Sequence, residues 1–164
     1  MNIALATDHA GFEQLKQLKA YLESEGHVCR DFGPDSFDAD DDYPDFIFPA
    51  AKAVASGECE AGIIMGGSGQ GEAMAANRVK GARCTLFYSP ATPQAAVDAE
   101  GRTSDDAYEI LSLSRKHNHA NMLSLAARFL TLDEMKQAVD AWLVTPYDDA
   151  DRHVRRVRKL DELG

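Results

Sequence analysis

A glycine-rich stretch after a short apolar run is the first feature that could do chemistry. It spans residues 66–71 (GGSGQG), after the apolar residues 61–65, and holds four glycines in six residues. Such a backbone approaches a ligand closely and turns amide N–H groups toward it, and a helix that begins there adds its positive end. The stretch therefore predicts an anion-binding turn between a strand and a helix. It matches neither the dinucleotide fingerprint nor the Walker loop, and a tight turn without a ligand is the alternative.

Glu72 directly follows this loop and falls in the first turn of the expected helix. A carboxylate there is favoured by the helix dipole and can cap a free amide, with Gly69 as the N-cap. Beside an anion-binding loop, the same carboxylate could remove a proton next to a carbonyl while the amides stabilise the resulting enediolate. Capping explains Glu72 alone, and the adjacent loop favours the general base.

Two further polar pairs stand at the ends of expected elements. Asp8 and His9 follow the first apolar run, at the carboxyl end of a strand, where ligands bind in open α/β sheets. Asp8 could equally cap the helix that begins near Gly11. His117 and Asn118 close a predicted helix, where a histidine is often only a partner of the helix dipole.

A basic group lies near the C-terminus of an otherwise acidic chain. Arg152 and Arg156 are four residues apart and share one helix face, so their planar guanidinium groups could clamp a phosphate. Arg128, after the last expected strand, is a candidate third member. The alternative is a solvated surface on which nearby aspartates pair with these arginines.

Short apolar runs alternate with longer amphipathic ones along the chain, which predicts βαβ units around a parallel sheet. Expected strands cover residues 3–7, 28–32, 61–65, 83–88 and 122–126. Expected helices cover residues 11–25, 45–56, 69–79, 108–117, 132–144 and 151–163.

Two segments interrupt this alternation. Residues 35–42 hold five aspartates and are predicted to form a solvated loop, which Tyr43 ends in an extended conformation because Pro44 follows it. Residues 89–106 contain two prolines and a glycine and are predicted to include a short extra helix.

The composition restricts the class of protein. A chain of 164 residues is the size of one domain, so residues 1–164 are expected to form a single domain. The formal net charge of -10 opposes binding to nucleic acid or an anionic membrane. The three scattered cysteines indicate reduced thiols, and the N-terminal residues lack the pattern of a secretory leader, so a cytoplasmic protein is expected.

Taken together, these motifs resemble the family of ribose-5-phosphate isomerase B and its galactose- and allose-phosphate isomerase relatives. The resemblance covers nearly the whole chain and is carried by seven ordered motifs: residues 8–11 (DHAG), 42–44 (DYP), 66–71 (GGSGQG), 75–77 (AAN), 114–118 (SRKHN), 139–143 (VDAWL) and 152–156 (RHVRR).

The resemblance implies a three-layer α/β/α sandwich with a five-stranded parallel sheet, which is Rossmann-like. Part of the family uses a cysteine just before the glycine loop as its base, but Gly66 stands at that position here. The other branch uses a glutamate after the loop, which makes Glu72 the base that moves a proton between C1 and C2. No metal and no cofactor are implied.

The resemblance also assigns roles to the remaining candidates and implies at least a homodimer, with a tetramer left open, whose site lies between subunits. His117 would assist ring opening. The catalytic set is then Glu72, His117 and Ser68, and the substrate-binding set is Asp8, His9, Tyr43, Gly67, Gly69, Gly71, Asn118, Arg128, Arg152 and Arg156. Within the latter, His9, Arg128, Arg152 and Arg156 would hold the phosphate.

One departure leaves the choice of sugar open. Between Tyr88 and Ser114 the chain is longer than the family usually allows, which defines an insertion near residues 89–106. The leading hypothesis is interconversion of ribose 5-phosphate and ribulose 5-phosphate through a cis-enediolate. The alternatives are isomerisation of allose 6-phosphate or galactose 6-phosphate, and a non-catalytic subunit that only binds a sugar phosphate.

Overall fold

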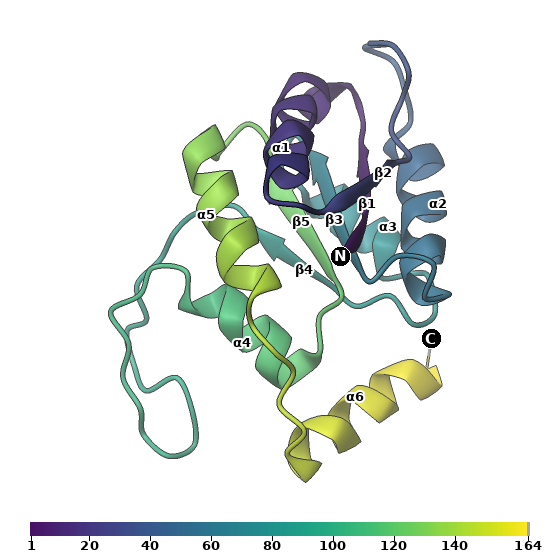
Figure 1. Ribbon diagram of the computed structural model, residues 1–164. Coiled ribbons are helices and arrows are strands. Elements are labelled where there is room, and N and C mark those ends of the chain that lie inside the picture. Colours follow the sequence, from purple (N-terminus) through teal and green to yellow (C-terminus); the bar gives the residue numbers. More distant parts are fainter. Residues whose placement is uncertain (164) are drawn as a thin grey trace.

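The computed structural model describes residues 1–163 and shows a five-stranded parallel sheet between two layers of helices (Figure 1). The predicted three-layer α/β/α, Rossmann-like sandwich is therefore confirmed. The strands lie in the spatial order β2 (Val28–Asp31), β1 (Asn2–Thr7), β3 (Ala61–Gly66), β5 (Met122–Ala126) and β4 (Cys84–Phe87).

Each face of the sheet has its own apolar core, because successive side chains of a strand point to opposite faces. Ile3 and Leu5 of β1 pack with α1 (Phe12–Ser24), α4 (Glu109–Asn118) and α5 (Leu132–Leu143). Ala4 and Ala6 pack on the other face with α2 (Tyr43–Ala55) and α3 (Gln70–Ala76). The last helix, α6 (Asp151–Leu163), lies against α4 rather than on the sheet (Figure 1).

The strand order defines where a ligand is expected. β1 is flanked by β2 on one side and by β3 on the other, so the chain reverses its direction of winding between β1 and β3. In open α/β sheets, ligands bind beyond the carboxyl ends of the strands at such a switch point. The short helix η1 (His9–Gly11) follows β1 there, and the glycine-rich loop follows β3.

Two predicted boundaries differ because of one side chain. α3 was expected to reach residue 79 and the fourth strand to begin at residue 83. Asn77 instead ends α3, and its side chain accepts from the amide of Cys84 at 2.8 Å and donates to the carbonyl oxygen of Cys84 at 2.9 Å. This exchange connects the end of α3 to the start of β4.

The extended conformation expected at Tyr43 is wrong. Tyr43 is the first residue of α2, and the preceding Asp42 is the extended N-cap, with φ -100° and ψ 109°. Pro44 is tolerated in the first helical turn because its missing N–H has no partner to lose there.

The extra helix expected within residues 89–106 is also absent, although the structure describes that whole segment. It forms an irregular loop, as Gly101 with φ 83° and two prolines favour. Arg102 holds it together: the guanidinium donates to Asp98 at 3.1 Å and to Glu109 at 2.5 Å, at the start of α4. The carboxyl pKa of Glu109 is lowered mainly by this bond.

Within residues 1–163, the structure contains no helix that is both long and apolar enough to cross a lipid bilayer.

Candidate active site

Glu72 is buried in the first turn of α3, with only 4% of its surface exposed. Its carboxylate occupies the space where Gly66 has no side chain, because a Cβ atom on Gly66 would lie 1.9 Å from Oε1 of Glu72. Burial raises the carboxyl pKa of Glu72, and the nearby charge of Asp8 raises it further, against the lowering effects of its own backbone amide and of His9. A buried carboxylate with a raised pKa is suited to accept and return a proton near neutral pH.

The loop before α3 and the first turn of α3 hold glycines at positions where a side chain would meet other atoms. Gly69 is left-handed, with φ 71°, and its carbonyl oxygen accepts from the hydroxyl of Ser124 at 2.6 Å. A Cβ atom on Gly71 would lie 2.9 Å from the ring of Tyr43. Ser68, which precedes Gly69, is exposed, and Gly67 lies beside Arg128. Sequence reasoning missed Ser124 because it lies inside an ordinary apolar strand.

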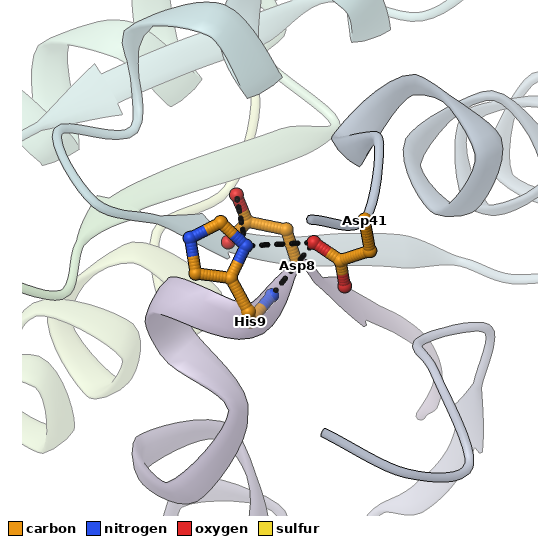
Figure 2. Close-up of side chains that lie close together, drawn as sticks. All are labelled: Asp8, His9 and Asp41. Carbon is orange, nitrogen blue, oxygen red and sulfur yellow. Dashed lines mark hydrogen bonds and ion pairs between the residues drawn. The ribbon is translucent and has the colours of Figure 1, made fainter. Parts of the chain in front are cut away.

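Asp8, His9 and Asp41 meet beside this loop (Figure 2). Asp8 is buried, and its Oδ1 accepts from the amide of Ala10 at 2.9 Å, so it caps η1 and not the helix expected to begin near Gly11, whose N-cap is Gly11 itself. The ring Nδ1 of His9 lies 2.7 Å from Oδ1 of Asp41, and the backbone amide of His9 donates to the same oxygen at 3.2 Å.

Asp41 was missed by sequence reasoning and corrects the prediction for residues 35–42. That segment is a loop, but Asp41 points inward and its side chain is only 7% exposed. A run of five aspartates carries no signal that one of them folds against a histidine far along the chain.

Asp8, His9 and Asp41 are also the group within residues 1–163 that could hold a metal ion. Each offers one carboxylate or imidazole ligand atom, and these atoms lie within 4.8 Å of one another. Two ligands of a tetrahedral zinc ion lie about 3.3 Å apart, given metal–ligand distances of about 2.0 Å. The 2.7 Å between His9 and Asp41 is instead a hydrogen-bond distance, so the arrangement fits a bonded pair better than an ion.

The predicted residues divide into two groups, one at the carboxyl ends of the parallel strands (the carboxyl edge) and one at their amino ends (the amino edge). At the carboxyl edge, the structure gathers Asp8, His9, Tyr43, Gly67, Ser68, Gly69, Gly71, Glu72 and Arg128. Arg128 joins this group because its amide donates to the carbonyl oxygen of Gly67 at 3.1 Å.

His117, Asn118, Arg152 and Arg156 form the second group, at the amino edge. α4 runs back across the sheet before β5 begins, so its last residues lie far from the glycine loop along the strand direction (Figure 1). Asn118 lines a cavity of about 390 Å³ with Cys84 at the start of β4 and Asp161 of α6. This cavity therefore belongs to the amino edge and not to the neighbourhood of Glu72.

His117 stacks on His153 of α6, with ring centroids 4.4 Å apart and an angle of 3° between the planes. His153 is buried, and its pKa is lowered first by burial and then by the charges of His117 and Arg152. Arg152 and Arg156 stand on adjacent turns of α6, and Nη1 of Arg152 lies 3.6 Å from Oε1 of Glu100 in the 89–106 loop.

The sequence pattern of the Ribose/Galactose Isomerase family matches residues 3–101 and 105–160. The chain belongs to this family. A ribose-5-phosphate isomerase B of Mycolicibacterium paratuberculosis is 41% identical over 162 residues, which cover 99% of this chain and 91% of that protein. The ribose-5-phosphate isomerase B of Mycobacterium tuberculosis H37Rv is 38% identical over 99% of this chain and 89% of its own length.

Solved structures of the family share the fold over almost their full length. A ribose 5-phosphate isomerase from Thermotoga maritima has a TM-score of 0.83 and 35% identity, covering 98% of this chain and 97% of that one. Ribose-5-phosphate isomerase B from Mycoplasma genitalium, solved with bound ribulose 5-phosphate, has a TM-score of 0.82 and 34% identity, covering 99% and 95%.

Proposed function

We propose that the chain interconverts ribose 5-phosphate and ribulose 5-phosphate through a cis-enediolate, with Glu72 as the base. The observation that carries this proposal is the buried carboxylate of Glu72, with its raised pKa, beside the glycine loop at the switch point of the sheet. Support for the substrate comes from the relatives named ribose-5-phosphate isomerase B.

The chemistry follows from which atoms carry charge. In the aldose-to-ketose direction, Glu72 removes the proton from C2, and the electron pair forms the double bond of the enediolate while negative charge develops on the oxygen of C1. In this proposal, backbone amides of the glycine loop and the hydroxyl of the exposed Ser68 donate to that oxygen. A proton then passes from the hydroxyl of C2 to the oxygen of C1, and protonated Glu72 delivers its proton to C1, which leaves the carbonyl on C2.

The remaining residues of the carboxyl edge hold the substrate. Asp8 and Tyr43 flank the loop and offer partners for sugar hydroxyls. His9 and Arg128 lie close enough for Arg128 to lower the pKa of His9, and together they offer two cationic groups to the phosphate.

A complete site requires a second subunit in this proposal. His117, Asn118, Arg152 and Arg156 lie at the amino edge of their own chain, so they would reach the glycine loop of a partner. Exposed apolar side chains near the outermost strand β4 would suit an interface. Met74 of α3 is 65% exposed, Tyr88 after β4 is 56% exposed and Ile110 of α4 is 54% exposed.

Mixing two inactive variants tests the shared site. We expect Glu72→Gln and His117→Ala each to lose nearly all activity, and a mixture unfolded and refolded together to regain about a quarter of it, because heterodimers contain one intact site. Activity of the refolded mixture is compared with each variant refolded alone. If the mixture stays inactive while the wild type refolds to full activity, the site lies within one chain.

The function itself is tested by a coupled assay of the purified protein with ribose 5-phosphate, with EDTA present throughout. We expect EDTA-resistant isomerisation, because every step above uses protein groups alone. Loss of activity on chelation, restored by an added divalent ion, would contradict the metal-independent mechanism while leaving the reaction in place.

A six-carbon substrate is the second candidate, and the 89–106 loop is the observation that favours it. Its Glu100 lies 3.6 Å from Arg152, a predicted phosphate ligand, so the loop can influence where a phosphate lies and how long a sugar fits. We expect kcat/KM to be higher for ribose 5-phosphate than for allose 6-phosphate or galactose 6-phosphate. The reverse order would select the six-carbon reading, and binding without turnover of any of the three would select a non-catalytic subunit.

A further inference from the structure

Asp41 and His9 form the best-defined polar contact near the site. One oxygen of Asp41, Oδ1, accepts from the backbone amide of His9 at 3.2 Å and lies 2.7 Å from its ring Nδ1. Two bonds from the same residue to one oxygen fix both the position of the histidine backbone and the plane of its ring. Figure 2 shows the second ring nitrogen of His9 on the side away from Asp41.

The burial of Asp41 needs a reason, because a carboxylate loses hydration when it is buried. Its side chain is 7% exposed, and its other oxygen, Oδ2, has no hydrogen-bond partner among residues 1–163. A positive charge on His9 offsets that loss through a charge-assisted bond, whereas a neutral ring offsets less of it.

The charges around His9 favour the cation on balance. The bond to Asp41 raises the pKa of His9 most, burial lowers it, the charges of Asp8 and Asp41 raise it, and Arg128 lowers it. Glu72 also faces His9 closely enough for His9 to lower the pKa of Glu72. Three carboxylates, those of Asp8, Asp41 and Glu72, therefore favour the charged form of the His9 ring. One guanidinium, that of Arg128, disfavours it.

We propose that Asp41 is a positioning residue that keeps His9 protonated, with Nδ1–H bound to the carboxylate and Nε2–H presented to the phosphate of the substrate. The proposal rests on the proposed function, in which His9 contacts that phosphate. A purely structural role for Asp41, anchoring the 35–42 loop to η1, would need only the bond to the backbone amide of His9.

Asp41→Asn separates the two roles, because the amide oxygen can still accept both bonds while the negative charge is lost. The variant-to-wild-type ratio of KM for ribose 5-phosphate is measured at pH 6 and pH 8, so that titration of the substrate phosphate itself cancels. A histidine with a raised pKa keeps its charge at low pH and loses it as the pH rises. The ratio is therefore expected to rise from pH 6 to pH 8, by up to about tenfold, with kcat unchanged.

The matched control is Asp40→Asn, which removes the same charge from the neighbouring, exposed position. Its KM ratio is expected to stay near one at both pH values. Equal ratios at pH 6 and pH 8 for Asp41→Asn would assign Asp41 a structural role only and overturn the proposal.

An NMR titration of the His9 ring keeps this test independent of the reaction. The His9 signal is assigned by its loss in His9→Gln, and its pKa is expected to fall in Asp41→Asn and to stay unchanged in Asp40→Asn. Inorganic phosphate is then added at pH 7.5, and a weaker shift of the His9 signal is expected in Asp41→Asn. An unchanged His9 titration refutes the proposal even if the enzyme is active, and a lowered one supports the pairing even if ribose 5-phosphate is not turned over.

Discussion

The Glu72→Gln protein is expected to bind ribose 5-phosphate and to turn it over about 10²–10⁴-fold more slowly than the wild type, the usual contribution of a general base. Glutamine fills the same space beside Gly66 but cannot take the proton from C2. The measurement is kcat and KM in the coupled assay, together with exchange of the C2 proton into deuterated water. A variant that keeps more than half of the wild-type kcat would remove Glu72 from the mechanism.

The same substitution is expected to make the fold more stable at neutral pH. A carboxyl group whose pKa is raised in the folded state contributes stability at low pH, and that contribution is lost as the pH rises through the raised value. Glutamine is neutral at every pH, so Tm of Glu72→Gln should exceed that of the wild type at pH 7.5 and approach it in acid.

Glu134 is a matched control, for which we expect the opposite change in Tm. Glu134 also lies in the first turn of a helix, α5, but its pKa is lowered by bonds from Thr131, in a capping box. Glu134→Gln should therefore reduce Tm at pH 7.5, and the difference should shrink as the pH falls through the lowered pKa. Lower Tm for both variants would mean that Glu72 is a structural cap.

The Gly66→Ala protein is expected to lose activity almost as completely as Glu72→Gln, although it changes no functional group. Gly66 ends β3 without a left-handed backbone, so alanine suits its conformation and only space is at issue. The added methyl group would lie within 2.0 Å of the carboxyl carbon of Glu72 and must displace it. Overpacking of this kind destabilises a fold by about 1–3 kcal/mol.

A double-variant cycle distinguishes this clash from general damage. In Gly66→Ala combined with Glu72→Ala, the methyl group enters the space that the carboxylate has left. The free energy of unfolding of the double variant should then match that of Glu72→Ala, with a coupling of about 1–3 kcal/mol between the two positions. Additive losses in denaturant unfolding would show that position 66 acts independently of Glu72.

The sequence predicted the fold well because its main signals are local. Apolar runs and helical spacing identified all five strands and their parallel class. Errors arose where a distant partner decides the outcome: Asn77 ends α3 because it bonds to β4, and Asp41 turns inward because it meets His9. The 89–106 loop has no helical hydrogen-bond pattern. A side-chain contact, from Arg102 to Glu109, holds it to α4 instead.

The sequence indicated which candidate residues follow the strands, but not how all the candidates are arranged. Asp8, the glycine loop and Glu72 each follow a strand of the parallel sheet, so a common edge could be inferred from the sequence. The separation of His117 and Arg152 from that edge depends on the course of α4 and α6, which residue types alone do not reveal. That a second subunit brings the two groups together stays a prediction.

The contact between Gly66 and Glu72 also limits how such an enzyme can evolve. A cysteine at position 66, as the resemblance places in the other branch of the family, and a glutamate at position 72 would compete for one volume. A lineage starting from this chain that acquires Gly66→Cys first displaces its working base, and one that loses Glu72 first has no base at all. Neither order of single substitutions avoids a weakened intermediate, so these two positions are epistatic and should be inherited as a pair.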